Sequence, residues 1–367
     1  MTRRQLLASA IVLAGCGRRK GSGFPGYAFV ANEQGRAIAA VDLTAFAVAR
    51  HIRLAEAPTE VLARSGKPFA YALTPASGEL HEIDVAALKV SRKARVARTA
   101  ATMRMDPSGD YVWVACASPR QLMRVPLDSL RPGGAIPLPS EPAGFDISRS
   151  GRAAAVTFGD AGSMAILDLV TGVRRIVAHG RALHGVMFRS DGRVVLGADT
   201  ASRSIVILDA GTGRTVVKLP VAVRPDNFCM KADGGQLFVT GEGMDAVVFI
   251  YPYNTEVAET ILAGRSPGAM AESTASSFLF VANSASGEVS VVDIETRRVI
   301  AVAQVGREPT CIGITPDQQY ALVLNRGSGD VAVIRIAAIA AKRSKYAPLF
   351  TMIPVGSGPV SVAIRRV

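Results

Sequence analysis

The sequence has few of the residues and motifs that point to catalysis or metal binding. Only four of its 367 residues are Cys and four are His, and no two His are spaced as metal ligands. The cysteines fit neither a zinc site nor the CxxCH pattern of covalent haem attachment. No serine-hydrolase, phosphate-loop, zinc-protease or dinucleotide motif stands in the strand-to-helix context that its chemistry needs. We therefore expect no metal site and no resident cofactor.

Long apolar runs are also missing, although apolar residues are plentiful. No run reaches the roughly 18 residues of a membrane-spanning helix. The chain is 49% hydrophobic and 20% charged, with 35 Gly and 20 Pro, which indicates a folded core with many turns. Its net charge is +12, but the basic residues are scattered and no aromatic platform lies beside them. This argues against nucleic acid as a partner.

The N-terminus predicts export and lipid attachment. Arg3 and Arg4 precede a short apolar stretch at residues 6–14, which resembles a signal peptide ending in a lipobox at Cys16. The run TRRQLL also resembles a twin-arginine signal, so the twin-arginine and general secretory routes both stay open. We expect residues 1–15 to be the signal peptide, 16–26 the lipidated Cys and a linker, and 27–367 one domain. The chain would be a membrane-anchored cell-envelope lipoprotein, facing the periplasm or the surface. Gly17 favours the outer over the inner membrane in a Gram-negative host.

A repeat of about 42 residues fills the chain from Tyr27 onward. Its clearest landmark is an apolar strand that ends in an acid, and the spacing between copies is 40 to 44 residues. The landmark positions are Asp42, Asp84, Asp128, Asp168, Asp209 and Asp293, with Tyr251 and Arg335 in two degenerate copies. Each period holds four short strands separated by turn residues, which is typical of a propeller blade. The repeated Asp is predicted to accept hydrogen bonds from the backbone of the turn that follows it.

Eight copies of each strand type predict an all-β fold, an eight-bladed β-propeller of four-stranded antiparallel blades. The chain starts on a second strand at Tyr27 and ends on a first strand at residues 359–364. The last strand should therefore complete the first blade and remove an open sheet edge. Seven blades is the alternative, and we expect a monomer.

The repeat units resemble those of the YVTN-repeat (YncE-like) β-propeller family. The resemblance rests on FVAN at residues 280–283 with VSVVD at 289–293, and on YAFVAN at 27–32 with AVD at 40–42. It covers nearly all of residues 27–367, although blades two and three fit loosely. It implies exported binding or assembly proteins more often than enzymes.

Propellers line a central channel with the first strand of each blade, so alternate residues of these strands are candidates for ligand contact. At one mouth of the channel the candidates are Glu60, Arg104, Asp146, His184, Asp226 and Asn227. At the other end a basic ring that could hold an anion is formed by Arg64, Arg189, Lys231 and Arg365. The alternatives are a hydrated channel at the mouth and solvated turn residues in place of the ring.

Two functions remain open at this stage. The first is a binding or scaffolding protein for a protein, a peptide or an envelope polymer. The second is an enzyme at the channel mouth, either a lactonase-like hydrolase or a haem-handling oxidoreductase with His184 as axial ligand. A catalytic role would need acid, base or metal-binding groups to converge at the mouth.

Overall fold

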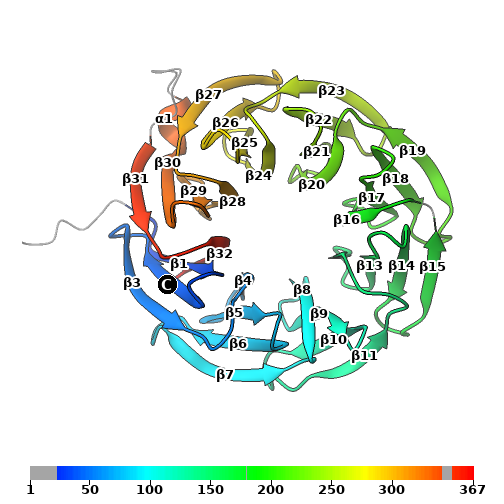
Figure 1. Cartoon of the computed structure of the whole chain (residues 1–367), viewed down its shortest axis with the longest axis horizontal. Helices are drawn as coiled ribbons and strands as arrows, with labels where there is room; N and C mark the ends of the chain where they lie inside the picture. The colour runs from blue at the N-terminus through cyan, green and yellow to red at the C-terminus, as the bar shows by residue number, and fades with distance from the viewer. Residues whose placement is uncertain (1–22, 179, 341–348) are drawn as a thin grey trace, which may run out of the picture.

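The chain folds into a ring of eight four-stranded antiparallel sheets around a central channel (Figure 1). The structure is a computed structural model that describes residues 23–178, 180–340 and 349–367. The prediction of an eight-bladed propeller is confirmed, and the seven-blade alternative is wrong. Blades A to H follow the order of the chain, and in each blade the strands are ordered from the channel to the rim.

Each blade begins with an innermost strand. These strands are β32 (Pro359–Arg366) in blade A, β4 (Glu60–Ala63) in B, β8 (Thr99–Met105) in C, β12 (Gly144–Ile147) in D, β16 (Leu183–Phe188) in E, β20 (Arg224–Met230) in F, β24 (Pro267–Ser273) in G and β28 (Pro309–Ile314) in H. The second strands, from blade A to H, are β1 (Gly26–Asn32), β5 (Phe69–Thr74), β9 (Tyr111–Ser118), β13 (Ala153–Thr157), β17 (Val194–Asp199), β21 (Leu237–Glu242), β25 (Phe278–Asn283) and β29 (Tyr320–Asn325).

The third strands carry the repeated landmark. They are β2 (Ala37–Asp42), β6 (Glu79–Asp84), β10 (Gln121–Pro126), β14 (Ser163–Asp168), β18 (Ser204–Asp209), β22 (Ala246–Tyr251), β26 (Glu288–Asp293) and β30 (Asp330–Arg335). The rim strands are β3 (Ala47–Arg53), β7 (Lys89–Arg95), β11 (Gly133–Pro137), β15 (Arg174–Ala178), β19 (Thr215–Pro220), β23 (Glu256–Leu262), β27 (Arg298–Gln304) and β31 (Leu349–Pro354). One short helix, α1 (Ile336–Ala340), lies between β30 and β31. None of the helices among the described residues is long and apolar enough to cross a membrane.

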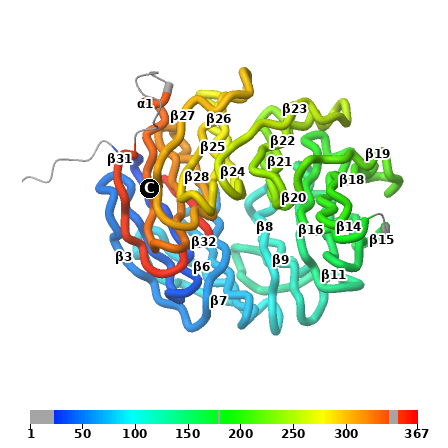
Figure 2. Tube along the Cα trace, turned by 45° about the horizontal axis from the view of Figure 1, so that its top comes forward, coloured from blue at the N-terminus to red at the C-terminus, as the bar shows by residue number. Residues whose placement is uncertain are grey.

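The ring closes as the repeat predicts. β32 pairs antiparallel with β1, with Val362 opposite Val30 and Ile364 opposite Ala28. The blue and red ends of the chain therefore meet in one blade (Figure 2). This pairing leaves no blade with an incomplete sheet, which removes an edge that could recruit another chain.

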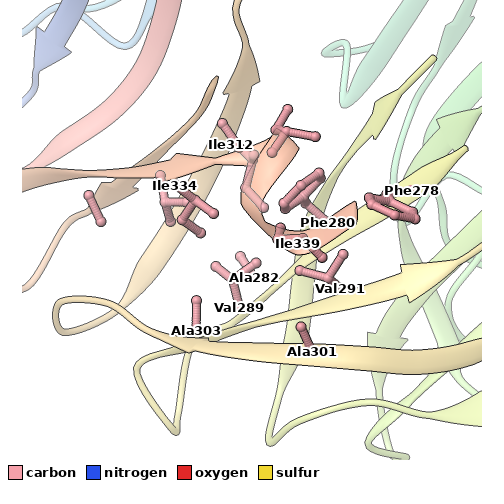
Figure 3. Close-up of a cluster of buried hydrophobic side chains, with 14 residues drawn as sticks. Phe278, Phe280, Ala282, Val289, Val291, Ala301, Ala303, Ile312, Ile334 and Ile339 are labelled. Atoms are coloured by element: carbon pink, nitrogen blue, oxygen red, sulfur yellow. The ribbon is translucent and has the colours of Figure 1, made fainter. Parts of the chain in front are cut away.

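The core consists of apolar layers between neighbouring blades. Phe280 of blade G is fully buried and packs in one cluster with Ile312 and Ile334 of blade H (Figure 3). Full burial of a side chain of this size contributes about 1.5–3 kcal/mol. Because every blade needs its neighbours to bury both faces, the eight blades form one structural unit.

The two faces of the ring carry different connections. The turn face holds the turns from innermost to second strands and from third to rim strands; β1 begins and β32 ends on it. The mouth face holds the loops from second to third strands and the connections from rim to innermost strands. The repeated Asp residues stabilise turns on the turn face: Asp168 Oδ1 accepts hydrogen bonds from the amides of Val170 and Thr171, both at 2.9 Å. The predicted structural role is confirmed for five of the six landmark Asp residues, whereas Asp128 Oδ1 accepts from Arg64.

The cysteines are structural. Cys116, Cys229 and Cys311 are all free. Burial raises the pKa of the Cys116 and Cys229 thiols to about 12 and that of Cys311 to about 11. Because the thiolate is the reactive form, these thiols are inert at neutral pH. Cys16 lies outside the described residues.

Candidate functional site

The polar residues of the innermost strands serve mainly to join neighbouring blades. An innermost strand has a sheet partner on one side only, so part of its backbone needs hydrogen-bond partners from elsewhere. Glu60 of blade B accepts one backbone and one side-chain hydrogen bond from blade C. Its Oε2 accepts from the amide of Met103 at 2.6 Å, and its Oε1 accepts from the hydroxyl of Thr102 at 2.5 Å.

Asp146 plays the same part between blades D and E. Its Oδ2 accepts a 2.7 Å hydrogen bond from the amide of Phe188. Burial raises the pKa of Asp146, and the amides of Phe188 and Ile147 and the charge of Arg104 offset this only in part. The carboxyl group is thus a buried acceptor that links two innermost strands.

Arg104 lies between these two carboxylates on the channel wall. Its guanidinium donates to the carbonyl of Met103 at 2.9 Å and lies 3.6 Å from Glu60 Oε1. Glu60, Arg104 and Asp146, predicted separately for the channel mouth, are therefore one inter-blade cluster in blades B to D. All three are engaged by neighbouring protein groups.

The expectation that alternate residues of these strands all face the channel is wrong for several apolar positions. Met187 packs with the core between blades E and F, and Cys229 packs with the core between F and G. Cys311 packs in the same way between blades H and A. The innermost strand of the next blade lies beside each of these strands. Side chains that strand alternation would place in the channel therefore pack between blades instead.

The four residues of the predicted basic ring lie on the turn face at the ends of innermost strands. Arg64 is 4% exposed and lies 2.8 Å from Asp128 and 3.3 Å from Asp110. Arg189 pairs with Asp191 at 2.8 Å, and Lys231 pairs with Asp233 at 2.6 Å.

Arg365 donates from Nε to the carbonyl of Lys67 at 3.0 Å. Anion binding by this ring stays a prediction, and the four ion pairs leave it little uncompensated charge.

A cavity of about 590 Å³ opens on the mouth face between blades E and F. We call this cavity the mouth pocket, and it is lined by His184, Thr200, Ala201, Arg224, Asp226 and Glu242. His184 and Asp226 were predicted from the sequence. Asn227 lies beside the pocket, where its side-chain amide donates to Asp226 Oδ2 at 3.3 Å.

Three polar members of the mouth pocket escaped the sequence analysis. Arg224 starts β20 just before Pro225, and Glu242 ends β21 at the mouth face. Thr200 follows β17 and donates to the carbonyl of Ala182 at 3.3 Å. The one available signal was their position: each lies next to a predicted strand end on the same face as His184.

The backbone of His184 is held firmly by blade D. Leu183 and Gly159 exchange two backbone hydrogen bonds, of 2.8 and 3.0 Å, across the blade boundary. The hydroxyl of Thr157 donates to the His184 carbonyl. Gly159 has a φ of +49°, a conformation that glycine adopts readily, and it lets the loop approach the imidazole.

The imidazole itself is uncommitted. It is half-buried, it lines the mouth pocket, and it forms no hydrogen bond or ion pair within the part of the chain that the structure describes. Because the backbone is already fixed, binding of a ligand would have to order only the imidazole.

The mouth pocket carries both signs of charge. Arg224 and Glu242 lie 3.8 Å apart, and both side chains are more than half exposed, so their pairing is weak. Asp226 adds a second exposed carboxylate. Within residues 23–178, 180–340 and 349–367, no three His, Cys, Asp or Glu side chains are grouped as a metal site requires. The pocket is suited to hold a polar ligand with both donor and acceptor groups.

Comparison with known proteins identifies the fold. No protein-family model and no curated protein matches the sequence. Among solved structures, the dihydro-haem d1 dehydrogenase NirN in complex with DHE aligns with a TM-score of 0.76 at 15% identity, covering 95% of this chain and 76% of that chain. The hydrazine synthase of Kuenenia stuttgartiensis aligns with a TM-score of 0.61 at 17% identity over 76% of this chain and 96% of that one. A functionally unknown protein from Desulfotomaculum acetoxidans aligns with a TM-score of 0.63 at 12% identity over 92% and 98%. At these identities the similarity establishes the eight-bladed β-propeller fold alone.

Proposed function

We propose that this chain is an exported, lipid-anchored propeller of the YVTN-repeat type that binds a ligand or partner of the cell envelope through its mouth pocket. The observation that carries the proposal is the held backbone and free imidazole of His184 inside a 590 Å³ cavity. The N-terminal sequence supports export, and the turn face carries the start of β1, so the mouth pocket would point away from the anchored end.

Binding accounts for the side chains better than catalysis does. A hydrolase would need a general acid and a general base converging on one substrate position. The two most buried carboxylates of the predicted mouth, Glu60 and Asp146, instead accept backbone hydrogen bonds from the next blade. The remaining acids, Asp226 and Glu242, are exposed.

The proposal is tested by affinity capture from cell envelope with the full chain and two double variants. His184→Ala/Asp226→Ala removes the free imidazole and one carboxylate from the pocket. Glu295→Ala/Arg298→Ala replaces two exposed charged residues on the turn face and is the control.

We expect one partner or polymer at near-stoichiometric yield with the wild type and the control, and its loss with the pocket variant. Equal capture by all three proteins, or no partner with the wild type, would contradict the proposal.

A tetrapyrrole ligand is the second candidate. One structural neighbour was solved in complex with DHE, and in the mouth pocket the His184 imidazole could hold the metal of such a ligand and the Arg224 guanidinium a carboxylate. A bound haem-type group would supply redox chemistry, while these residues would hold and orient it. Titration with haem should then shift the absorption spectrum of the wild type but not of His184→Ala. A spectrum that is the same for both proteins would remove this candidate.

A further inference from the structure

A second cavity lies across the ring from the mouth pocket, on the mouth side of blade A. It has a volume of about 430 Å³, and its charged or titratable lining residues are Arg36, His51 and Arg53. No Asp or Glu lines it. Blade A is at the lower left of Figure 1, whereas β16 and β20, which carry the mouth pocket, are at the right.

Strand geometry brings these three side chains together. His51 and Arg53 are two residues apart on β3, so they project from the same face of the strand, while Ile52 between them is buried on the other. Arg53 is paired in register with Ala37 of β2, and Arg36 directly precedes Ala37. The side chains thus converge on one corner of the sheet.

Gly356 also lines this cavity, and its backbone φ is +115°. A Cβ there would lie 3.0 Å from the side-chain amide nitrogen of Asn32 and 3.9 Å from Cε1 of His51. The positive φ and the close approach to Asn32 therefore favour glycine at this position.

Among the described residues, no carboxylate lines the cavity beside the two arginines. The side chains of Arg53 and His51 form no hydrogen bond or ion pair with any described residue, and the side chain of Arg36 makes one long hydrogen bond of 3.4 Å to the carbonyl of Ala55. Like charges gathered without acids favour an anion in the space between them.

Blade A lacks an acidic residue that three other blades carry at the start of their third strand. The first residue of the third strand is Glu79 in blade B, Glu288 in G and Asp330 in H, and in blade A it is Ala37. Glu79 pairs with Lys93 at 2.9 Å, and Lys93 has the register position that His51 has in blade A. Compared with blade B, blade A keeps basic or titratable residues at this corner and lacks the acid that neutralises them there.

We propose that Arg36, His51 and Arg53 form an oxyanion-binding site for a phosphoryl or carboxylate group, in which the ligand takes the place of the missing acid. Two guanidinium groups and an imidazole are suited to oxyanions because their donors form charge-assisted hydrogen bonds. The site is independent of the mouth pocket.

The test is titration calorimetry of the full chain with inorganic phosphate, and separately with citrate, at low ionic strength. Ala37→Glu restores the acid that blades B and G carry in the same register, so the fold has a precedent for it. Arg53→Ala removes one cation. Arg95→Ala is the matched control. Arg95 is opposite Glu79 in the strand register of blade B, as Arg53 is opposite Ala37 in blade A.

We expect the wild type and Arg95→Ala to bind one of the two anions equally, Arg53→Ala to bind it about tenfold more weakly, and Ala37→Glu to lose it. The anion that binds more tightly identifies the ligand class. No binding of either anion by the wild type, or unchanged binding by Arg53→Ala, would overturn the proposal. Because Arg53 is exposed, its variant tests the site even if Ala37→Glu fails to fold.

Discussion

Asp146 provides the sharpest test of how the ring is held together. Asp146→Ala removes the acceptor for the Phe188 amide, which is 2.7 Å away on the neighbouring blade. An N–H left without a partner in a buried position costs about 1–3 kcal/mol. Asp146→Asn keeps a carbonyl oxygen at nearly the same place, so we expect a change of less than about 1 kcal/mol.

The pH dependence of this pair has a definite sign. Burial raises the pKa of Asp146, so the folded state binds its proton more readily than the unfolded chain does. The contribution of Asp146 to stability is therefore greatest below the unfolded pKa of about 3.9 and falls as the pH rises toward the folded pKa. Asn carries no charge at any pH, so Asp146→Asn should gain stability relative to the wild type as the pH rises through this window.

Urea unfolding followed by the fluorescence of Trp113, the single Trp, measures both effects. The titrations are run for the wild type and both variants on either side of the window. The reasoning fails if Asp146→Ala is as stable as the wild type. It also fails if Asp146→Asn loses stability relative to the wild type as the pH rises.

Three further predictions concern the core, the anchor and the orientation. Glu82 is 1% exposed and accepts hydrogen bonds from Tyr71 at 3.1 Å and from Arg92 Nε at 2.8 Å. We therefore expect Glu82→Ala to lower the free energy of unfolding by about 2–4 kcal/mol, measured by urea unfolding. The matched control, Glu79→Ala at a more exposed position, should lower it by less than about 1 kcal/mol. Burial alone would raise the pKa of Glu82, but hydrogen bonds from Arg92, Ser91 and Tyr71 outweigh it and lower the pKa, so this stabilisation should be lost as the pH falls through the folded pKa. Cys16→Ser should move the protein from the membrane to the soluble envelope fraction, whereas Cys311→Ser should leave it membrane-bound; an unchanged Cys16→Ser distribution would argue against lipidation. A thiol label at Ser284→Cys on the mouth face should react faster in anchored protein than one at Thr296→Cys on the turn face, and equal rates would contradict the proposed orientation.

The sequence predicted the fold because the information that specifies it is local and repeated. Five of the six landmark Asp residues end a strand and accept from the turn after it, as Asp42 does from the amide of Thr44 at 2.8 Å. Turn chemistry of this kind acts over three or four residues, so it can be recognised in each copy separately. Closure followed from counting strands, since a chain that starts on a second strand needs its last strand, around Val362, to complete the blade.

The candidate site was only partly predictable. Alternation along a strand tells which face of a sheet a residue lies on, and it selected Glu60 and Asp146 as channel-side candidates. It cannot tell that a backbone amide of the next blade, that of Met103 or Phe188, lies within hydrogen-bond distance. Glu242 is opposite Arg224 of its own blade, whereas His184 comes from blade E, and this juxtaposition is set by ring geometry.

The geometry of the ring divides the polar residues of the innermost strands into two groups. Along the channel wall, each innermost strand has an unpaired edge, and Glu60, Asp146 and Ser361 are used to satisfy amides of the following blade. Replacing one of these changes the joint between two blades. At the mouth, where the strand is only beginning, the backbone of His184 is already bound by blade D, and its side chain is not needed for closure. Ligand recognition in this chain should therefore depend on strand-start and loop residues, which can change with little effect on the stability of the ring.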